Sequence, residues 1–268
     1  MPPRLDEVLS ELDAIAPLAL AADWDNVGLL LEPLANPNPT VRRVLLTIEL
    51  SERVVDEALE HQAQLVVAYH PPIFHGLKRL TPRDAEGHVL LRTLEGGLAV
   101  YSPHTALDAV VGGVNDWLAE AIGPGTCKPV VPSPTESAAT GWGRQVELAE
   151  PVRLTTAVER IKRHLGLALV RVAASERHSR GAPIRSFAVC AGAGGSVLAP
   201  LHGVDLLLTG EMRHHDVREQ AVAGTSVVLC DHTNTERGYL PHLAALLQAR
   251  MDIAVQVSQC DRDPLQVV

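Results

Sequence analysis

The sequence predicts an α/β protein built from two similar repeats, each with a mixed, largely parallel sheet and crossover helices. The first observation is that short apolar, β-branched runs alternate with stretches whose apolar residues recur at helical spacing. The second is that the order helix, strand, strand, helix, strand, helix, strand, helix occurs once in each half of the chain. Because parallel strands need crossover connections, which are usually helices, each half is expected to form an open sheet.

The two repeats are expected to be separated by a linker. We expect residues 1–127 to form the first repeat, residues 128–150 a linker or long loop, and residues 151–268 the second repeat. The linker is predicted because residues 128–143 are rich in Pro, Ser, Thr and Gly, as loops are. A chain of 268 residues with 46% hydrophobic content is long enough to bury a substantial core.

The first half begins with a predicted helix over residues 5–12, and a second predicted helix spans residues 51–62 with Ser51 as its N-cap. The predicted strands of the first half are residues 29–31, 44–48, 64–68 and 98–103. The third of these strands runs into Tyr69-His70, and the prolines that follow forbid a helix. His70 is therefore expected at a strand end, on a stiff loop.

The second half repeats this order after a capped amphipathic helix over residues 155–166. Its predicted strands are residues 168–172, 186–190, 204–209 and 226–230. The glycine-rich segment 191–196 is interpreted first as a tight turn and second as a contact for a substrate phosphate, because it matches neither common phosphate-binding motif.

His232 and Glu236 lie four residues apart directly after the last predicted strand. If a helix begins there, the imidazole and the carboxylate share one face. The same pattern occurs earlier, where a strand runs into His104 and Asp108 follows four residues later. Both copies are followed by glycine and an amphipathic helix, which indicates an internal duplication.

Strand-end histidines occur in four clusters, and together they predict a metal site. The clusters are Tyr69-His70, His104 with Asp108, His214-His215, and His232 with Glu236. Imidazole and carboxylate ligands suit zinc, manganese, iron or nickel, and a shared carboxylate can bridge two ions in hydrolases that activate water. The alternative, that these are hydrogen-bonded loop residues, would suffice for any single cluster.

Composition restricts the classes of function. A net charge of −9 argues against nucleic acid as a partner, since phosphate backbones attract basic surfaces. The four cysteines form no Cys-x-x-Cys pair, so neither a zinc knuckle nor a disulfide framework is expected. The sequence shows neither a membrane-length apolar run nor a signal peptide, and a cytoplasmic protein is expected.

Five ordered motifs resemble those of the Nif-three-like family, many of whose bacterial members are labelled GTP cyclohydrolase I type 2 homologues. They are residues 24–29, residues 70–74, His104 to Asp108 with residues 112–115, Thr209-Gly210-Glu211 with residues 214–216, and His232 with Glu236. The resemblance implies two α/β repeats, a homohexameric ring and a pair of metal ions in each subunit.

The resemblance also implies the site residues. The implied metal ligands are His70, Asp108, His232 and Glu236, with Asp108 and Glu236 bridging. His104 is implied as a further ligand or a proton carrier, and it is the candidate catalytic residue. Tyr69 stands where bacterial members have histidine, as in the animal branch, so one or two divalent ions per subunit are expected.

The leading hypothesis for function is a metal-dependent hydrolase that uses activated water on a nucleotide or phosphate-ester-like substrate. The competing hypothesis is a non-catalytic, metal-binding ring that acts as a regulatory or scaffolding partner. The expected partners are other copies of the chain and a small anionic substrate, without a membrane.

Overall fold

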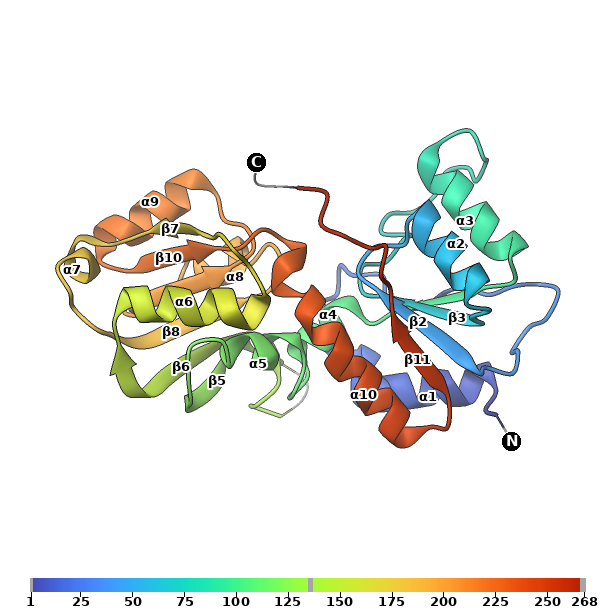
Figure 1. Ribbon diagram of the computed structural model, residues 1–268, viewed down its shortest axis with the longest axis horizontal. Helices are drawn as coiled ribbons and strands as arrows, with labels where there is room; N and C mark the ends of the chain where they lie inside the picture. The colour runs from blue at the N-terminus through green and yellow to red at the C-terminus, as the bar shows by residue number, and fades with distance from the viewer. Residues whose placement is uncertain (1, 135–136, 266–268) are drawn as a thin grey trace. The chain divides into compact units, whose positions relative to one another are not determined.

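The structure, a computed structural model, describes residues 2–134 and 137–265 and divides into two compact units (Figure 1). The first unit consists of the described residues up to Leu107 together with Tyr239–Arg262. The second unit consists of Asp108–Gly238 together with residues 263–265. This division differs from the predicted one, because the last helix and strand return to the sheet of the first unit.

The first unit is built on a five-stranded sheet with the order β1-β4-β3-β2-β11. All neighbouring strands are parallel except β1, which pairs antiparallel with β4. Its strands are β1 (Gly28–Leu31), β2 (Arg43–Thr47), β3 (Leu65–Ala68), β4 (Ala99–Ser102) and β11 (Ala254–Val257). Its helices are α1 (Leu5–Ile15), η1 (Leu18–Leu20), α2 (Glu52–Glu60), α3 (Ala85–Glu95) and α10 (Leu240–Arg250), and α4 (His104–Ala109) begins in it.

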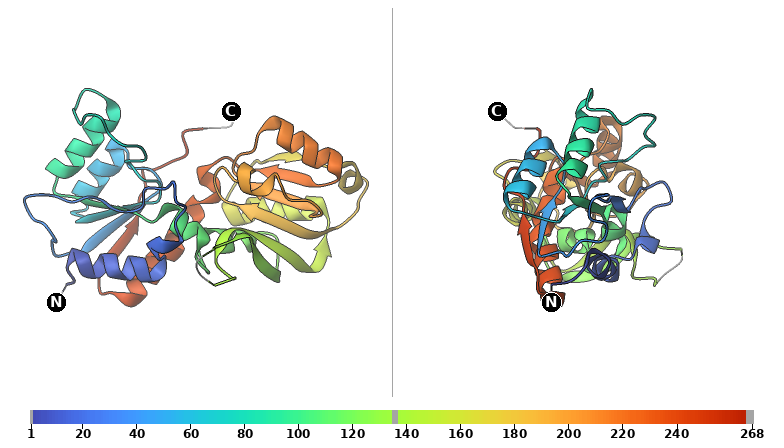
Figure 2. Two further views of the ribbon diagram at one scale, coloured as in Figure 1. Left: turned by 180° about the vertical axis from the view of Figure 1, so that it is seen from behind. Right: turned by 90° about the vertical axis from the view of Figure 1, so that its right-hand side faces the viewer.

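Helices cover both faces of this sheet. Figures 1 and 2 show α2 and α3 together on one face and α1 and α10 on the other. Leu45, Val66 and Val100 face α2 and α3, where they pack against Val54 and Leu90. Successive strand residues point to opposite faces, so the residues between these face α1 and α10. The strand residues on both faces are buried.

The second unit is built on a six-stranded sheet with the order β5-β6-β8-β9-β10-β7. Strands β8, β9 and β10 are parallel, whereas β5, β6 and β7 are antiparallel to their neighbours. Its strands are β5 (Gly125–Pro132), β6 (Gly141–Val152), β7 (Arg171–Ala173), β8 (Ile184–Cys190), β9 (Leu206–Thr209) and β10 (Ser226–Leu229). Its helices are α5 (Val114–Ala119), α6 (Leu154–Leu165), α7 (Glu176–Ser179), α8 (Gly195–Leu198), α9 (His214–Ala223), η2 (Thr233–Thr235) and η3 (Arg237–Tyr239).

The two sheets contain the same four-stranded motif. In the first unit the order is β1-β4-β3-β2, and in the second it is β7-β10-β9-β8. In both, a short antiparallel edge strand pairs with the third of three parallel strands. The predicted α/β class with mixed sheets is therefore confirmed; the first sheet is largely parallel, as predicted, whereas the second is parallel only over β8, β9 and β10.

The segment predicted as a linker contains most of a β-hairpin made by β5 and β6. Pro129 and Pro132 lie in β5, where proline is tolerated because β5 is an edge strand. Arg144 of β6 is buried, and its Nε donates to Asp116 Oδ1 at 2.5 Å. The composition of this segment therefore predicted a loop where the structure has a β-hairpin. The inner strand of the hairpin, β6, carries the buried Arg144.

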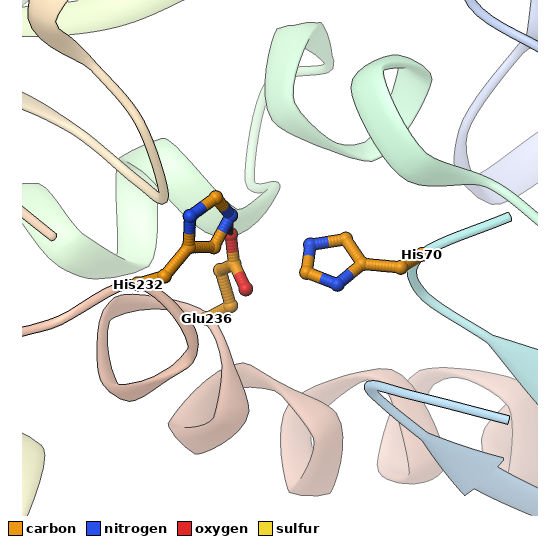
Figure 3. A group of neighbouring side chains, drawn as sticks. All are labelled: His70, His232 and Glu236. Atoms are coloured by element: carbon orange, nitrogen blue, oxygen red, sulfur yellow. Dashed lines mark ion pairs between the residues drawn. The ribbon is translucent and has the colours of Figure 1, made fainter. Parts of the chain in front are cut away.

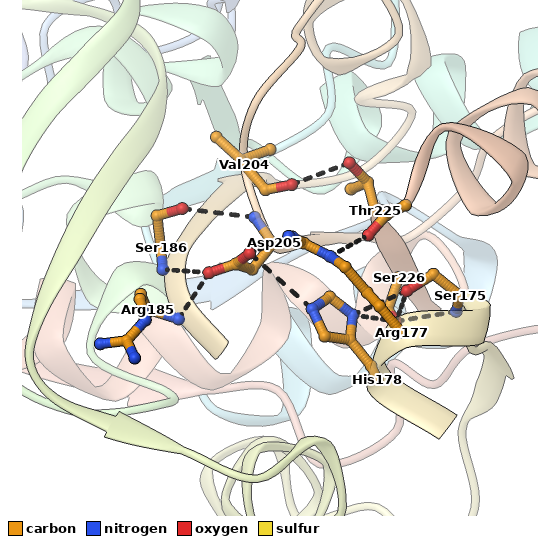
Figure 4. A network of polar contacts seen from close by, with 10 residues as sticks. Ser175, Arg177, His178, Arg185, Ser186, Val204, Asp205, Thr225 and Ser226 are labelled. Carbon is orange, nitrogen blue, oxygen red and sulfur yellow. Dashed lines mark hydrogen bonds and ion pairs between the residues drawn. The ribbon is translucent and has the colours of Figure 1, made fainter. Parts of the chain in front are cut away.

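A polar network joins α7 to the parallel strands of the second unit (Figure 4). The Asp205 carboxylate accepts hydrogen bonds from the amides of Arg185 and Ser186 and pairs with Arg177. His178 lies beside it, with Nδ1 at 2.8 Å from Ser226 Oγ. Burial, and then the charge of Arg177, lower the pKa of His178, so its ring is held neutral within this network.

No helix in the described part of the chain combines the length and the apolarity needed to cross a bilayer.

Candidate metal centre

His232 and Glu236 lie together in the loop that follows β10 (Figure 3). The predicted helix start is a 3-10 turn, η2, which still directs both side chains to the same side. His232 Nε2 lies 3.3 Å from Glu236 Oε1, and only 3% of the Glu236 side chain is exposed. Burying a carboxylate is costly unless it is paired, so this position suits a group that binds a cation.

Asp108 shares its surroundings with Glu236. Burial, followed by the charges of Asp108 and Glu236, raises the pKa of the Cys190 thiol far above its usual range. Both carboxylates therefore lie near the end of β8. Asn115 connects the Asp108 backbone to the end of this strand, because its Nδ2 donates to the Asp108 carbonyl at 3.1 Å and its Oδ1 accepts from the Ala191 amide at 2.9 Å.

Gly192 packs closely against the His232–Glu236 pair. A Cβ at this position would lie 2.5 Å from Glu236 Oε1 and 2.8 Å from His232 Nε2. Gly192 also has a φ of +60°, which favours glycine. No side chain larger than hydrogen fits between the loop and the pair.

The glycine-rich loop is a tight turn, as the first interpretation of its sequence holds. Its amides donate to protein acceptors: Ala191 to Asn115 Oδ1, Gly192 to Thr235 Oγ1 at 2.8 Å, and Gly194 to Thr209 Oγ1 at 3.1 Å. These three amides already donate to protein acceptors. The loop contacts the site through Gly192, which packs closely against His232 and Glu236.

His70 and His104 lie together in the first unit. Their ring centroids are 5.4 Å apart, and the rings meet edge to face. His70 follows β3, and its Nδ1 lies 2.6 Å from Glu49 Oε1. The buried Tyr69 ring contacts both, at 5.1 Å from His70 and 5.6 Å from His104. Tyr69 thus supports the two imidazoles through its ring.

Asp25 orients His104, a role that the sequence did not reveal. Asp25 Oδ1 lies 2.8 Å from His104 Nδ1, and its other oxygen accepts from the amide and hydroxyl of Thr105. The Asp25 side chain is fully buried, and burial acts to raise its pKa, but the hydrogen bonds from His104 and Thr105 bring the pKa below its usual value. The ionised carboxylate therefore fixes the imidazole, with Nδ1 as the donor.

The loops after β4 and β10 share a backbone feature. His104 has a φ of +27° and Asp231 a φ of +62°, and non-glycine residues adopt such angles at a cost. Each of the two residues lies two positions after the end of its strand. Strain of this kind is common where a loop must direct a functional side chain.

The predicted cluster His214-His215 lies at the start of α9. His214 and His215 open α9, are both exposed, and contact each other with ring centroids 5.5 Å apart. Among the described residues, they belong to no group of donors that could hold a metal ion.

A pocket of about 860 Å³ lies in the second unit beside His232. Glu211 and Asp231 line it, and Glu211 Oε2 is 3.6 Å from His232 Nδ1. Arg171 and Arg213 also line it, and Arg171 pairs with Asp231 at 2.7 Å. The pocket is large enough for a small molecule, and both arginine and carboxylate side chains line it.

These features define the class of protein: a two-repeat α/β protein with histidine and carboxylate side chains gathered at the carboxyl ends of parallel strands. The family model described as Duf34/NIF3 (NGG1p interacting factor 3) matches residues 3–264. The chain belongs to the DUF34/NIF3 family, and the resemblance inferred from its motifs is confirmed.

Relatives and solved structures agree with this assignment. A protein NIF3 homolog of Schizosaccharomyces pombe is 44% identical over 258 residues, which covers 92% of this chain and 91% of the relative. NIF3-like protein 1 of Drosophila melanogaster is 40% identical over 267 residues, covering 99% and 89%. A Bacillus cereus protein related to NIF3 superposes with a TM-score of 0.86 at 22% identity, with each chain covered completely, and shows the shared fold.

Proposed function

We propose that His70, His232 and Glu236 hold one divalent metal ion, and that Asp108 can serve as a further ligand. His232 and Glu236 supply an imidazole and a carboxylate side by side (Figure 3), and His70 and Asp108 are the further ligands that the family resemblance implies. The observation that carries the proposal is the His232–Glu236 pair, in which the carboxylate is buried and the imidazole is partly exposed. Two imidazoles and a carboxylate suit zinc, manganese, iron or nickel better than calcium or magnesium.

We infer that the site serves hydrolysis. A divalent ion held by these residues would supply the Lewis acidity that activates water or polarises a phosphoryl oxygen. His104 is suited to carry a proton, because Asp25 fixes its Nδ1 and leaves Nε2 as the proton-accepting atom. This arrangement of carboxylate and imidazole is the usual way of orienting a general base.

The proposed substrate is a small anionic molecule of the nucleotide or phosphate-ester type. The pocket beside His232 supports a small molecule, and Arg213 in its wall makes no ion pair among the described residues. An arginine without an acidic partner can bind phosphate or carboxylate in a bidentate manner.

The second candidate function is a non-catalytic, metal-binding ring, proposed as a homohexamer, that acts as a regulatory partner. It is favoured by one observation: a relative in Saccharomyces cerevisiae, 36% identical over 281 residues, is named NGG1-interacting factor 3. A ring that binds metal for structural reasons would retain the ion but show no turnover.

Metal content per subunit, measured by elemental analysis, tests the proposal. The wild-type chain is compared with the double variant Asp108→Ala, Glu236→Ala, and His215→Ala serves as a control that removes an exposed histidine of the same unit. We expect near-stoichiometric metal in the wild type and the control, and its loss in the double variant. Metal retained by a folded double variant would contradict the site.

A screen for hydrolysis of nucleotides and phosphodiesters follows with the same proteins. Turnover that falls in step with metal content would support the hydrolase. Stoichiometric metal without turnover on any substrate in the screen would favour the regulatory ring.

A further inference from the structure

Trp24 and Phe74 form an exposed aromatic pair in the first unit. The Trp24 side chain is 65% exposed and that of Phe74 is 41% exposed. Their ring centroids are 6.0 Å apart with an interplanar angle of 63°, an edge-to-face contact. Because most aromatic surface is buried in folded proteins, two large rings that contact each other in solvent call for a functional explanation.

The loop that carries Trp24 is firmly anchored. The amide of Ala22 donates to Thr105 Oγ1 at 3.0 Å, and Asn26 Nδ2 donates to the Ile73 carbonyl at 2.5 Å. Between these two bonds, the Asp25 carboxylate is fixed by His104. The indole is therefore held outward by a hydrogen-bonded loop, which makes it a preformed surface.

The aromatic pair borders His104. The Trp24 ring lies 6.2 Å from the His104 ring at 77°, and the Phe74 ring lies 6.3 Å from it at 80°. A molecule resting on Trp24 and Phe74 would therefore reach the imidazole that we propose as a proton carrier. An interface used only for protein association would have no need of this adjacency.

Positive charge follows Phe74 along the same loop. Lys78 and Arg79 are exposed, and neither forms an ion pair with any described residue. They complement a ligand that carries negative charge. Aromatic rings with nearby basic side chains are the usual means of binding a base and its phosphate.

We propose that Trp24 and Phe74 form a stacking platform for a planar heterocyclic ring that belongs to an anionic substrate. The proposal rests on the hydrolase function, because it identifies the platform's occupant as the substrate of that site. It adds a ring-binding element in the first unit, which accounts for the exposure and anchoring of Trp24 and for its contact with His104.

Tryptophan fluorescence of the full, metal-free chain tests the platform. The chain has three tryptophans; Trp117 is 7% exposed, and the indole nitrogen of Trp142 is buried, so iodide should quench Trp24 preferentially. AMP, GMP and UMP are titrated separately, and ribose 5-phosphate serves as the control without a ring. We expect at least one nucleotide to protect Trp24 from iodide, and ribose 5-phosphate to give no protection.

Variants assign the effect to the rings. Trp24→Ala and Phe74→Ala should each weaken nucleotide binding about tenfold, as expected for loss of one stacking contact, while Trp24→Phe retains most of it. Leu34→Ala, which removes a 97% exposed apolar side chain from the same unit, should bind as the wild type does. Binding to the alanine variants is measured by equilibrium dialysis, because Trp24→Ala lacks the reporter.

Three results would overturn the platform. They are protection by ribose 5-phosphate equal to that by the nucleotides, wild-type nucleotide binding in both alanine variants, and shielding of Trp24 from iodide that depends on protein concentration without ligand. The last would mean that another copy of the chain covers the rings. Because these measurements use metal-free protein, the platform can be disproved while the metal site holds. Equally, the metal site can be disproved while the platform holds.

Discussion

At the scale of single residues, the site depends on a few buried side chains that hold exposed ones in place. Asp25 is the clearest example, since its buried carboxylate fixes both His104 and the start of α4. Glu236 has a comparable place beside His232 in the second unit. In both pairs the carboxylate is buried and the imidazole is partly exposed, which leaves the ring available to a ligand.

Asp25→Ala should lower the free energy of unfolding by about 3 kcal/mol, because it leaves the buried donors of Thr105 and His104 without their charged acceptor. Urea-induced unfolding measures the change. Asp23→Ala, at an exposed neighbouring carboxylate, is the matched control and should have little effect. Equal stability of the two variants would mean that Asp25 does not fix His104.

The sequence predicted part of this arrangement at the residue scale. The spacing of His232 and Glu236 placed both on one side of a turn, because local geometry alone decides that contact. The role of Asp25 could not be predicted, since it lies far along the chain from His104 and only the folded sheet brings them together. The one available signal was residues 24–28, whose turn-forming composition was a sufficient explanation on its own.

At the scale of elements, the loop after β8 determines how much space lies in front of His232 and Glu236. Its fold is set by hydrogen bonds to Thr209, the last residue of β9, and to Thr235 of η2, after β10. The closest approach is made by Gly192, where the backbone needs a positive φ. The loop therefore acts as a wall of the site.

Gly192→Ala should prevent metal binding while His232 and Glu236 remain in the chain. The added Cβ would lie within 3 Å of both side chains, and the left-handed backbone adds a strain of about 1 kcal/mol. Metal content measures the first effect. Gly203→Ala is the control, because that glycine also has a positive φ but has nothing within 4 Å of its Cβ position. A metal content near wild type in Gly192→Ala would show that the pair does not hold the ion in this space.

Elements were predicted unevenly from the sequence. Buried parallel strands such as β3 and β10 were found because their apolar runs are continuous. Most of the β5–β6 hairpin was predicted as a linker from its Pro, Ser, Thr and Gly content, because an edge strand such as β5 tolerates proline. Local composition carries no information about which strand lies at the edge of a sheet.

At the scale of the whole molecule, the duplication predicted from the sequence is present in the topology of both sheets. The exchange of α10 and β11 into the first unit was not predicted. β11 is a short strand that pairs with β2, far away in the sequence, and no local pattern identifies such a partner. The sequence thus indicated the repeat but not where the chain crosses between the units.

The central claim is that the His232–Glu236 pair holds a divalent metal ion. Affinity for Zn²⁺ and Mn²⁺, measured by competition with a chelating dye, tests it in the full chain. The variants are His70→Ala, His232→Ala and both together, with the exposed His61 changed to Ala as the control.

We predict that His70→Ala and His232→Ala each weaken binding by at least about tenfold, which corresponds to about 1.4 kcal/mol, and that His61→Ala leaves it unchanged. The combined variant should depart from the sum of the single effects, because ligands of one ion are coupled. Wild-type affinity in His232→Ala would contradict the site, whereas wild-type affinity in His70→Ala alone would remove His70 from the proposed ligands.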